Sequence, residues 1–219
     1  EEKKMEEMEV CFLMDRFGYM KLIDKNAYER NKEAVHNENK YVFNCMNTDK
    51  ICIFTDTGKM HTIKAVDIPL GRFRDKGTPV DNLSNYDSSQ ERMLYVAPVG
   101  QLRSDRLLFV TKTSMCKLVE GAEFDVAKRT IASTKLADED ELIFIGSASE
   151  MEQIVLQSHG GCFLRFLTQE VSTMKKTALG VRGMKLADDD YLEHAYLLAG
   201  HQEYTISYHD KEYALNKVR

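Results

Sequence analysis

The alternation of apolar and polar positions is clearest in the segment Ile51–Leu83. β-branched residues fill every second position of Ile51–Thr55, a turn follows at Asp56–Gly58, and the alternation returns in Met60–Lys64. This pattern is typical of two antiparallel strands joined by a tight turn. The segment is therefore expected to begin with a β-hairpin.

The rest of this segment predicts a further connection and a third strand. A turn at Pro69–Gly71 leads into the basic stretch Arg72–Gly77, which ends at a glycine, and then into a strand-like run at Val80–Leu83. The predicted unit is therefore strand, tight turn, strand, basic turn, strand.

The hairpin occurs in five copies, each with a small or turn-forming residue at its tip, as a tight connection requires. The copies are Cys11–Ile23, Cys52–Lys64, Leu108–Glu120, Ile154–Phe166 and Tyr204–Asn216, with turns at Gly18, Gly58, Ser114, Gly160 and Asp210. The turns follow one another at intervals of 40 to 56 residues. Such periods are typical of architectures in which each unit is a small antiparallel sheet that cannot bury its face alone.

Two further signals repeat in the same order. A basic run precedes Gly77, Thr130 and Gly180, each of which lies six residues before a leucine. An acidic or polar turn and an apolar strand then follow, beginning at Ser89, Asp138 and Asp188. The predicted repeats are residues 10–50, 51–104, 105–150, 151–193 and 194–219, with residues 1–9 as the end of a linker.

The first and last repeats depart from this pattern. Asn26–Lys40 has no glycine and little apolar periodicity, which predicts a long loop or a short helix in place of the basic turn. The last repeat stops at Arg219 before any basic turn, so its sheet is either incomplete or completed by the N-terminal strand near Val10–Met14.

Composition is that of an ordinary globular protein, with 43% apolar and 30% charged residues in 219. No run approaches the roughly 18 apolar residues that a membrane span needs, and the acidic start does not resemble a secretory signal, so a cytoplasmic protein is expected. The cysteines are odd in number and form no C-x-x-C pair, which predicts reduced core residues. They are Cys11, Cys45, Cys52, Cys116 and Cys162.

The net charge of −5 disfavours a nucleic-acid partner at first sight. The charges are unevenly distributed, however: Lys59–Lys76 has five basic residues against two acidic ones, and Phe163–Lys185 has five against one. Acidic residues gather instead at Glu1–Glu9, Asp138–Glu141 and Asp188–Asp190. Basic turns at repeating positions are therefore expected on an acidic molecule.

The order of these signals resembles the C-terminal domain of the A subunit of bacterial type IIA topoisomerases, DNA gyrase and topoisomerase IV. The clearest segments are Phe17–Lys21, Ile53–Lys59 with Ile68-Pro69, and Leu179–Leu186, and the resemblance extends from about Val10 to Arg219. It implies an all-β fold, a β-pinwheel that forms a propeller-like ring or spiral of about five strand-exchanged, four-stranded blades.

The resemblance also implies a function. Such a domain binds and bends duplex DNA along a positively charged outer rim, without sequence specificity, and presents a segment to the catalytic core. The implied partners are duplex DNA, the ATPase subunit, and the breakage-reunion domain that precedes such a domain in the same polypeptide. The fragment itself would be a monomer with no cofactor and no catalytic activity, whereas the parent enzyme would use ATP and Mg²⁺.

One departure bears on which enzyme is resembled. Gyrase carries a glutamine-arginine-arginine-glycine-glycine-lysine-glycine box after its first hairpin, and Tyr28–Lys40 holds nothing similar. The absence favours topoisomerase IV, with a gyrase domain whose box has degenerated as the alternative. A propeller-like protein-interaction module is the alternative from another class.

Lysines and arginines in the basic turns, and on strands beside them, are the candidate DNA contacts, because such side chains bind phosphates without reading sequence. They are Arg72, Arg74, Lys76, Lys59, Lys64, Lys128, Arg129, Lys175, Lys176, Arg182, Lys185, Lys21, Lys117 and Arg165. One position, three residues past each turn, holds Lys21, His61, Lys117, Phe163 and Tyr213. This mixture predicts an exposed strand face that either touches DNA or simply faces solvent.

No catalytic or metal site is predicted. Ser158–Gly161 contains a serine next to a histidine but falls in a hairpin turn, and spacing places no acid partner near it. Asp188–Asp190 has a counterpart at Asp138–Asp140, which marks both as repeat turns. No glycine-rich nucleotide loop is present.

Overall fold

The five predicted hairpins are all present in the computed structural model, which describes residues 5–218. They are β1 (Glu9–Met14) with β2 (Tyr19–Ile23), β4 (Lys50–Thr55) with β5 (Lys59–Lys64), β8 (Arg106–Thr111) with β9 (Met115–Glu120), β12 (Gln153–Ser158) with β13 (Phe163–Leu167), and β16 (Thr205–Tyr208) with β17 (Lys211–Ala214). Residues 1–4 of the predicted linker, and Arg219, lie outside the described residues.

A third strand pairs with the first strand of each of the first four hairpins. These strands are β3 (Tyr41–Met46), β7 (Met93–Pro98), β11 (Leu142–Ser147) and β15 (Leu192–Leu198). The last three follow the acidic or polar turns, as predicted. Because β15 pairs with β12, the fourth sheet extends past residue 193, where the sequence placed the end of the fourth repeat.

The fourth strand of each of the first three sheets comes from the following repeat. β6 (Thr78–Pro79) pairs with β2, β10 (Thr130–Ala132) with β5, and β14 (Val181–Arg182) with β9. Among the described residues the fourth sheet has three strands and the fifth has two. This mostly antiparallel, strand-exchanged architecture confirms the predicted all-β pinwheel.

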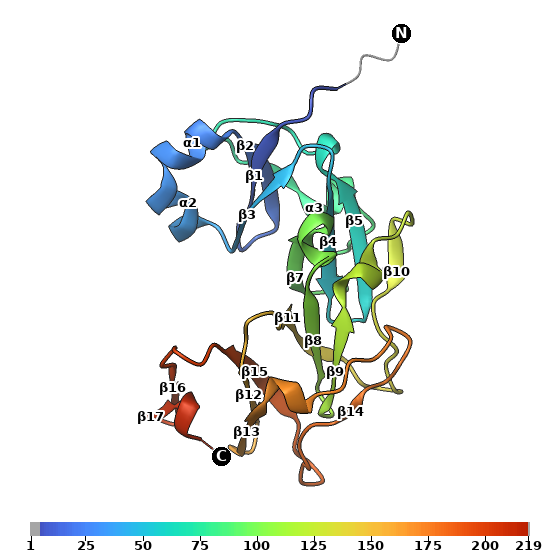
Figure 1. Cartoon of the computed structure of the whole chain (residues 1–219), viewed down its shortest axis with the longest axis vertical. Coiled ribbons are helices and arrows are strands. Elements are labelled where there is room, and N and C mark those ends of the chain that lie inside the picture. Colours follow the sequence, from blue (N-terminus) through green and yellow to red (C-terminus); the bar gives the residue numbers. More distant parts are fainter. Residues whose placement is uncertain (1–4, 219) are drawn as a thin grey trace.

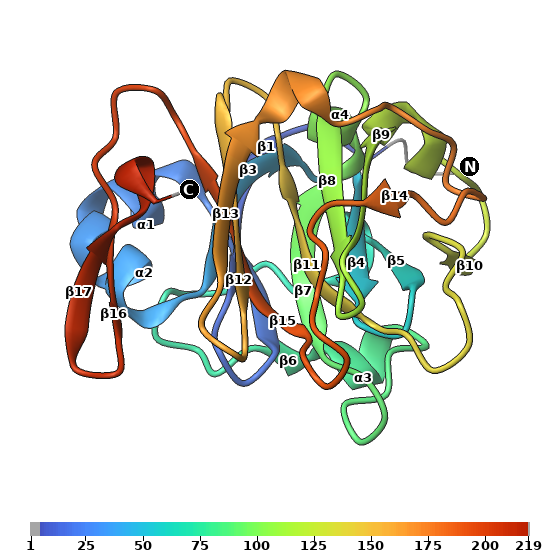
Figure 2. The ribbon, with the colours of Figure 1, turned by 90° about the horizontal axis from the view of Figure 1, so that it is seen from below.

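Successive sheets follow one another around an arc, from the N-terminal sheet at the top of Figure 1 to the hairpin β16–β17 at the lower left. Neighbouring sheets contact each other through β3, β7, β11 and β15, so these strands lie on the inner side of the arc. The short strands β6, β10 and β14 lie at the opposite, outer edges. In Figure 2 several of the hairpin turns lie together at one end of the molecule.

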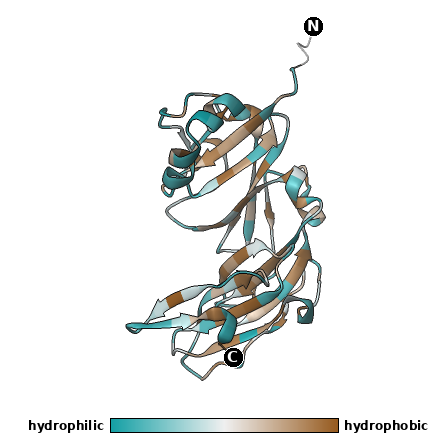
Figure 3. Cartoon of the chain, turned by 60° about the vertical axis from the view of Figure 1, so that its left-hand side comes forward, coloured by the Kyte–Doolittle hydropathy of each residue, from teal (hydrophilic) through white to brown (hydrophobic). Residues whose placement is uncertain are grey.

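The core consists of apolar layers between consecutive sheets, because each strand alternates its side chains between two faces. Phe12 and Ile53 belong to the layer between the first two sheets, and Phe54 and Phe109 to the next. Phe54 meets the ring of Phe124 edge to face, with the ring centroids 4.9 Å apart. The apolar colouring accordingly follows the strands in Figure 3.

Two helices replace the basic turn of the first repeat, which confirms the short-helix alternative for residues 26–40. The Asp24 side chain accepts a hydrogen bond from the Ala27 N–H at 2.7 Å and so caps α1 (Lys25–Arg30), and α2 (Lys32–Glu38) buries Val35. The remaining short helices are α4 (Val99–Leu102), η1 (Ala65–Asp67), η2 (Gly121–Phe124), η3 (Thr168–Glu170) and η4 (Leu215–Lys217).

The strand predicted at Val80–Leu83 is wrong, because these residues form the helical turn α3. The Val80 N–H still donates to the Gly18 carbonyl at 2.9 Å, but the Gly18 N–H bonds to Asp15 in the hairpin turn, so the pairing with the first hairpin goes no further. The Val80 carbonyl then accepts from both the backbone N–H and the hydroxyl of Ser84, which closes the turn.

The fourth hairpin turns at His159 and Gly160, as predicted, and the residue with positive φ is the following Gly161. Two smaller predictions change. The N-terminal strand does not complete the last sheet, since β1 lies between β2 and β3. Four cysteines are buried as expected, whereas Cys162 is exposed. In residues 5–218 no helix has the length and apolar character to cross a membrane.

Candidate nucleic-acid interface

The three basic turns lie at equivalent places, each directly before an outer strand. The first basic turn (Arg72–Gly77) leads into β6, the second (Lys128–Thr130) into β10, and the third (Lys175–Gly180) into β14. Because each of these strands is the outermost of its sheet, the turns recur along the outer side of the arc. The structure thus places the sequence-predicted basic runs on one rim.

Charged side chains of the first basic turn project into solvent. Arg72, Arg74 and Lys76 are all exposed, and the side chain of Arg72 is 91% accessible despite a 3.6 Å contact with Asp75. The Lys76 ammonium lies 4.7 Å from the ring centroid of Tyr19, an arrangement that orients the cation without neutralising it.

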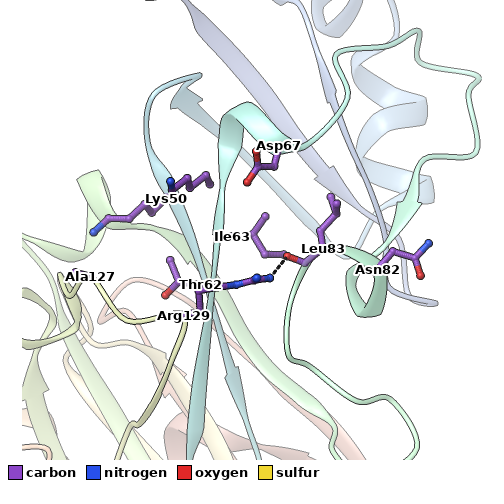
Figure 4. A pocket seen from close by; sticks show the side chains of 9 residues that line it. Lys50, Thr62, Ile63, Asp67, Asn82, Leu83, Ala127 and Arg129 are labelled. Carbon is purple, nitrogen blue, oxygen red and sulfur yellow. Dashed lines mark hydrogen bonds between the residues drawn. The ribbon is translucent and has the colours of Figure 1, made fainter.

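A hollow of about 500 Å³ borders the second basic turn (Figure 4). Lys64 and Arg129 line it together with Lys50 and one carboxylate, Asp67. The Arg129 guanidinium donates to the Leu83 carbonyl at 3.1 Å, whereas Lys50 bonds to Asp125 at 3.1 Å. Two of the predicted contacts, Lys64 and Arg129, thus share one hollow that is lined by three basic residues and one acidic one.

Around the third basic turn, Lys175, Arg182 and Lys185 are exposed and Lys176 is half-buried. The Lys176 ammonium donates to the Glu123 carbonyl at 3.0 Å, which ties this turn to the neighbouring chain segment. The remaining candidates Lys59 and Lys128 are exposed.

The position three residues past each hairpin turn is not the exposed face that the sequence predicted. Lys117 and His61 are each only 1% exposed, and Lys21 is half-buried. The Lys117 ammonium donates to the carbonyls of Lys175, Lys176 and Ala178, at 3.1, 3.1 and 2.7 Å. The prediction that Lys117 contacts DNA at the surface is therefore wrong, because the third basic turn covers this side chain.

Lys21 has the same relation to the first basic turn. Its ammonium donates to the carbonyls of Phe73 and Asp75, the latter at 2.7 Å. Burial lowers the pKa of Lys21, while Glu38, Asp75 and Asp15 act in the opposite direction. Burial also lowers the pKa of Lys117, to about 8, against the opposing charge of Glu123, so the ammonium form predominates at neutral pH.

In the second repeat the same position holds His61, which serves a buried polar network. Its Nε2 donates to Glu91 at 2.9 Å, and its Nδ1 shares a 2.9 Å hydrogen bond with the Thr130 hydroxyl. Burial acts to raise the pKa of Glu91, but hydrogen bonds from Thr55, the Asp87 N–H and Thr57, and the charge at His61, outweigh it and lower that pKa.

Arg165, another predicted contact, bonds within the fold. Its guanidinium donates to the Asn216 carbonyl and to the Gln153 side chain, and it is half-buried. Phe163 and Tyr213, in the remaining two copies of the repeated position, stack with ring centroids 5.3 Å apart. These residues join the last hairpin to the fourth sheet.

The sequence missed two basic residues beside the turns. Lys135 is exposed, and its N–H donates to the Lys176 carbonyl at 3.2 Å, next to the third basic turn. It precedes Leu136 as Lys185 precedes Leu186, so the repeat itself could have identified it. Arg30 on α1 lines a hollow of about 620 Å³ with Arg72 and Arg74, and no repeat signal marks it.

The serine, histidine and aspartates that the sequence excluded as catalytic or metal-binding groups take structural roles. Ser158 is fully buried and its hydroxyl accepts from the Cys162 N–H, while His159 pairs with Glu193 at 2.8 Å, an acid that spacing did not reveal. Asp190 accepts N–H groups of Gly160 and Tyr191, which closes a hairpin turn.

A family model described as "DNA gyrase C-terminal domain, beta-propeller" matches residues 49–88, 105–149 and 152–199. These segments make up more than half of the chain, which therefore belongs to this family. The resemblance to the C-terminal domain of type IIA topoisomerase A subunits is confirmed.

Among curated relatives, the DNA gyrase A subunit of Lawsonia intracellularis is 25% identical over 207 residues, 89% of this chain and 25% of that protein. The DNA gyrase A subunit of Salmonella typhimurium is 31% identical over 65% of this chain and 16% of its own length. The DNA topoisomerase 4 A subunit of Bacillus subtilis is 29% identical over 68% and 19%. The chain thus spans a quarter or less of these relatives.

Solved structures show the same fold. The C-terminal domain of DNA topoisomerase IV superimposes with a TM-score of 0.80 at 22% identity, covering 91% of this chain and 64% of that one. For the C-terminal domain of E. coli ParC the TM-score is 0.73 at 12% identity, covering 95% and 89%.

Proposed function

We propose that this chain binds and bends duplex DNA without sequence specificity, along the outer rim formed by the three basic turns. The supporting observation is their recurrence at the outer edges of three successive sheets, which spaces cations along a curve. Lysine and arginine neutralise phosphates and release counterions whatever the base sequence. Bending a site of 20–30 base pairs by tens of degrees costs about 1–6 kcal/mol, so contacts on several sheets are needed to offset it.

Within the family, we propose a role as the C-terminal domain of a topoisomerase IV A subunit. The helices α1 and α2 occupy the stretch where a gyrase box is expected, and the sequence there has no such box. In this role the chain is non-catalytic and presents DNA to the breakage-reunion domain of its own subunit. The parent enzyme, with its ATPase subunit, uses ATP and Mg²⁺ to relax and decatenate DNA in the cytoplasm. A gyrase domain with a degenerate box is the alternative.

The central test reverses three charges of the first basic turn, in the variant Arg72→Glu, Arg74→Glu, Lys76→Glu. We expect at least tenfold weaker binding of a random-sequence duplex at fixed salt, and a salt slope smaller by about one for each phosphate contact that the variant removes. Fluorescence anisotropy measures the affinity, and energy transfer between dyes at the duplex ends measures the bend.

The matched control reverses three exposed charges outside the basic turns, as Arg16→Glu, Arg106→Glu, Lys211→Glu. Both variants lower the net charge equally, so a rim-specific effect appears only in the first. If both variants weakened DNA binding equally, the loss of affinity would be due to net charge and not to the rim. Wild-type protein that fails to bind random duplex in a salt-dependent way contradicts the proposal and favours a protein-interaction module.

A further inference from the structure

Two basic turns cover lysines whose ammonium groups donate hydrogen bonds only to backbone carbonyls; Lys21 is half-buried and Lys117 is buried. Lys21 bonds to the carbonyls of Phe73 and Asp75, and Lys117 to those of Lys175, Lys176 and Ala178. The two lysines occupy equivalent positions in the first and third repeats. Their ammonium groups therefore fix the direction of the peptide units in the turns above them.

The geometry of the peptide unit determines where the backbone N–H groups of these turns point. In a trans peptide the C=O of one residue and the N–H of the next point in opposite directions. With five carbonyls directed inward at an ammonium, five N–H groups point away from it. That of Lys176 donates to the Glu123 carboxylate at 3.5 Å, which leaves the N–H groups of Arg74 and Lys76 in the first turn and of Thr177 and Leu179 in the third. These four residues are exposed, and within residues 5–218 the four N–H groups have no hydrogen-bond partner.

Each ammonium also strengthens the outward donors. A charge bonded to a carbonyl polarises the peptide unit, so its N–H becomes a better donor on the opposite side. Outward backbone N–H groups in a turn form concavities that bind anions, phosphate among them. Here the basic side chains of Arg74 and Lys76 are themselves exposed beside the first pair of N–H groups.

We propose that the first and third basic turns are phosphate-binding amide sites, the N–H groups of Arg74 with Lys76 and of Thr177 with Leu179, with Lys21 and Lys117 as positioning residues. The ligand is a phosphodiester oxygen of the duplex DNA bound at the rim, so the inference rests on the proposed function. Backbone groups thus join the side chains in holding the DNA.

The second repeat lacks this device and provides an internal control. His61 bonds to side chains of Thr130 and Glu91, so no ammonium holds a carbonyl of this turn. The Arg129 carbonyl instead accepts the backbone N–H of Thr62 at 2.8 Å. The glycines follow the same division: Gly77 and Gly180 have φ of +85° and +99°, whereas Thr130, the equivalent residue, is not among the positive-φ residues described. A Cβ at Gly77 would clash with the Met20 carbonyl oxygen. Only the two lysine-bearing repeats therefore use the left-handed turn.

The test follows the backbone amides of ¹⁵N-labelled chain by NMR during titration with a random-sequence duplex. We expect downfield shifts of the Arg74, Lys76, Thr177 and Leu179 amide protons at saturation, with smaller changes at Thr130. In Lys21→Met the first pair loses its shift and the second keeps it, and Lys117→Met gives the reverse. A merely structural loss of stability would not separate the two sites.

Binding measurements provide a second readout. Loss of one charge-assisted amide site is expected to weaken affinity roughly tenfold, with the salt slope unchanged because neither lysine side chain touches phosphate. Arg74→Gln, which removes a side-chain contact, is expected to lower the slope by about one. A lower slope in the lysine variants would contradict the positioning role.

The wild-type titration alone can overturn the inference, even where a variant folds poorly. If DNA binds with a normal salt slope and the four amides do not move, the amide sites are wrong and the proposed function stands. If the wild-type chain does not bind duplex DNA, the proposed function itself fails.

Discussion

In the second and third repeats the outer strand pairs in the same way, but the side chain beside that pairing makes different hydrogen bonds. Thr130 pairs with His61 where β10 meets β5, and β14 pairs with β9 directly beside Lys117. In the third repeat the Lys117 ammonium bonds to carbonyls of the basic turn, and in the second the His61 ring bonds to the Glu91 carboxylate and the Thr130 hydroxyl. The same position therefore supports the basic turn in the third repeat and a buried hydrogen-bond network in the second.

The acid that follows each hairpin accounts for part of this difference. Asp140 accepts the Thr113 N–H at 3.1 Å, and Asp190 accepts the Gly160 N–H at 2.8 Å. Glu91, at the equivalent place, is one methylene longer. It accepts hydrogen bonds from Thr55 at 2.8 Å and Thr57 at 3.0 Å and also reaches His61. Because its side chain is longer, Glu91 bonds to buried side chains, whereas Asp140 and Asp190 close hairpin turns.

The largest expected effect comes from breaking this network. Glu91→Ala leaves His61 and two hydroxyls without their acceptor, and should lower the free energy of unfolding by about 3 kcal/mol. Asp140→Ala, at an exposed turn, should lower it by about 1 kcal/mol. Urea unfolding monitored by circular dichroism compares them. Equal losses of stability would show that the two acids contribute alike.

A second pair of variants compares the equivalent positions Gly180 and Thr130, which differ in backbone conformation. Gly180→Ala should cost about 2 kcal/mol, because alanine resists a φ of +99° and its Cβ would lie 2.8 Å from the Cys116 carbonyl oxygen. Thr130→Ala loses only the hydroxyl bonds to His61 and Asn85, worth about 1 kcal/mol. Thermal unfolding of both tests the ranking. The reverse order would contradict the division between the repeats.

A third comparison uses pH. Lys117 has a pKa of about 8 in the folded protein and 10.5 as its ordinary value, so the unfolded chain binds more protons between these pH values. Its contribution to the free energy of unfolding is therefore unfavourable below pH 8 and improves as pH rises toward 10.5. Relative to Lys117→Met, the wild type should gain stability across this pH range. Raised cysteine pKa values affect both proteins alike, and a relative loss would contradict the assignment.

The smallest effect is expected at Lys135, beside the third basic turn. Lys135→Gln should weaken duplex binding about two- to threefold and lower the salt slope by less than one. Lys211→Gln, exposed on the last hairpin, is the control and should change neither. Anisotropy titrations at several salt concentrations measure both. An equal effect of the two would remove Lys135 from the rim.

The hairpins and the acidic or polar turns could be predicted because they depend on local alternation and turn residues. The burial of Lys117 could not, because the carbonyls that cover it lie 58 to 61 residues further along the chain. Alternation assigns a residue to a face of its strand and does not say what lies over that face. For the same reason no sequence pattern indicates that His61 meets Glu91. A strand is expected at Val80–Leu83, but the Val80 carbonyl is taken by Ser84 four residues on, and Asp81 and Asn82 are residue types that strands disfavour.

Strand exchange also imposes an order on assembly during synthesis. The edges of β2, β5 and β9 are available as soon as their own hairpins form, but β6, β10 and β14 belong to the repeats made next. Unpaired strand edges invite pairing with the wrong partner. As the chain leaves the ribosome, each new repeat therefore removes the exposed edge of its predecessor, and the three sheets should be completed in the order in which they are translated.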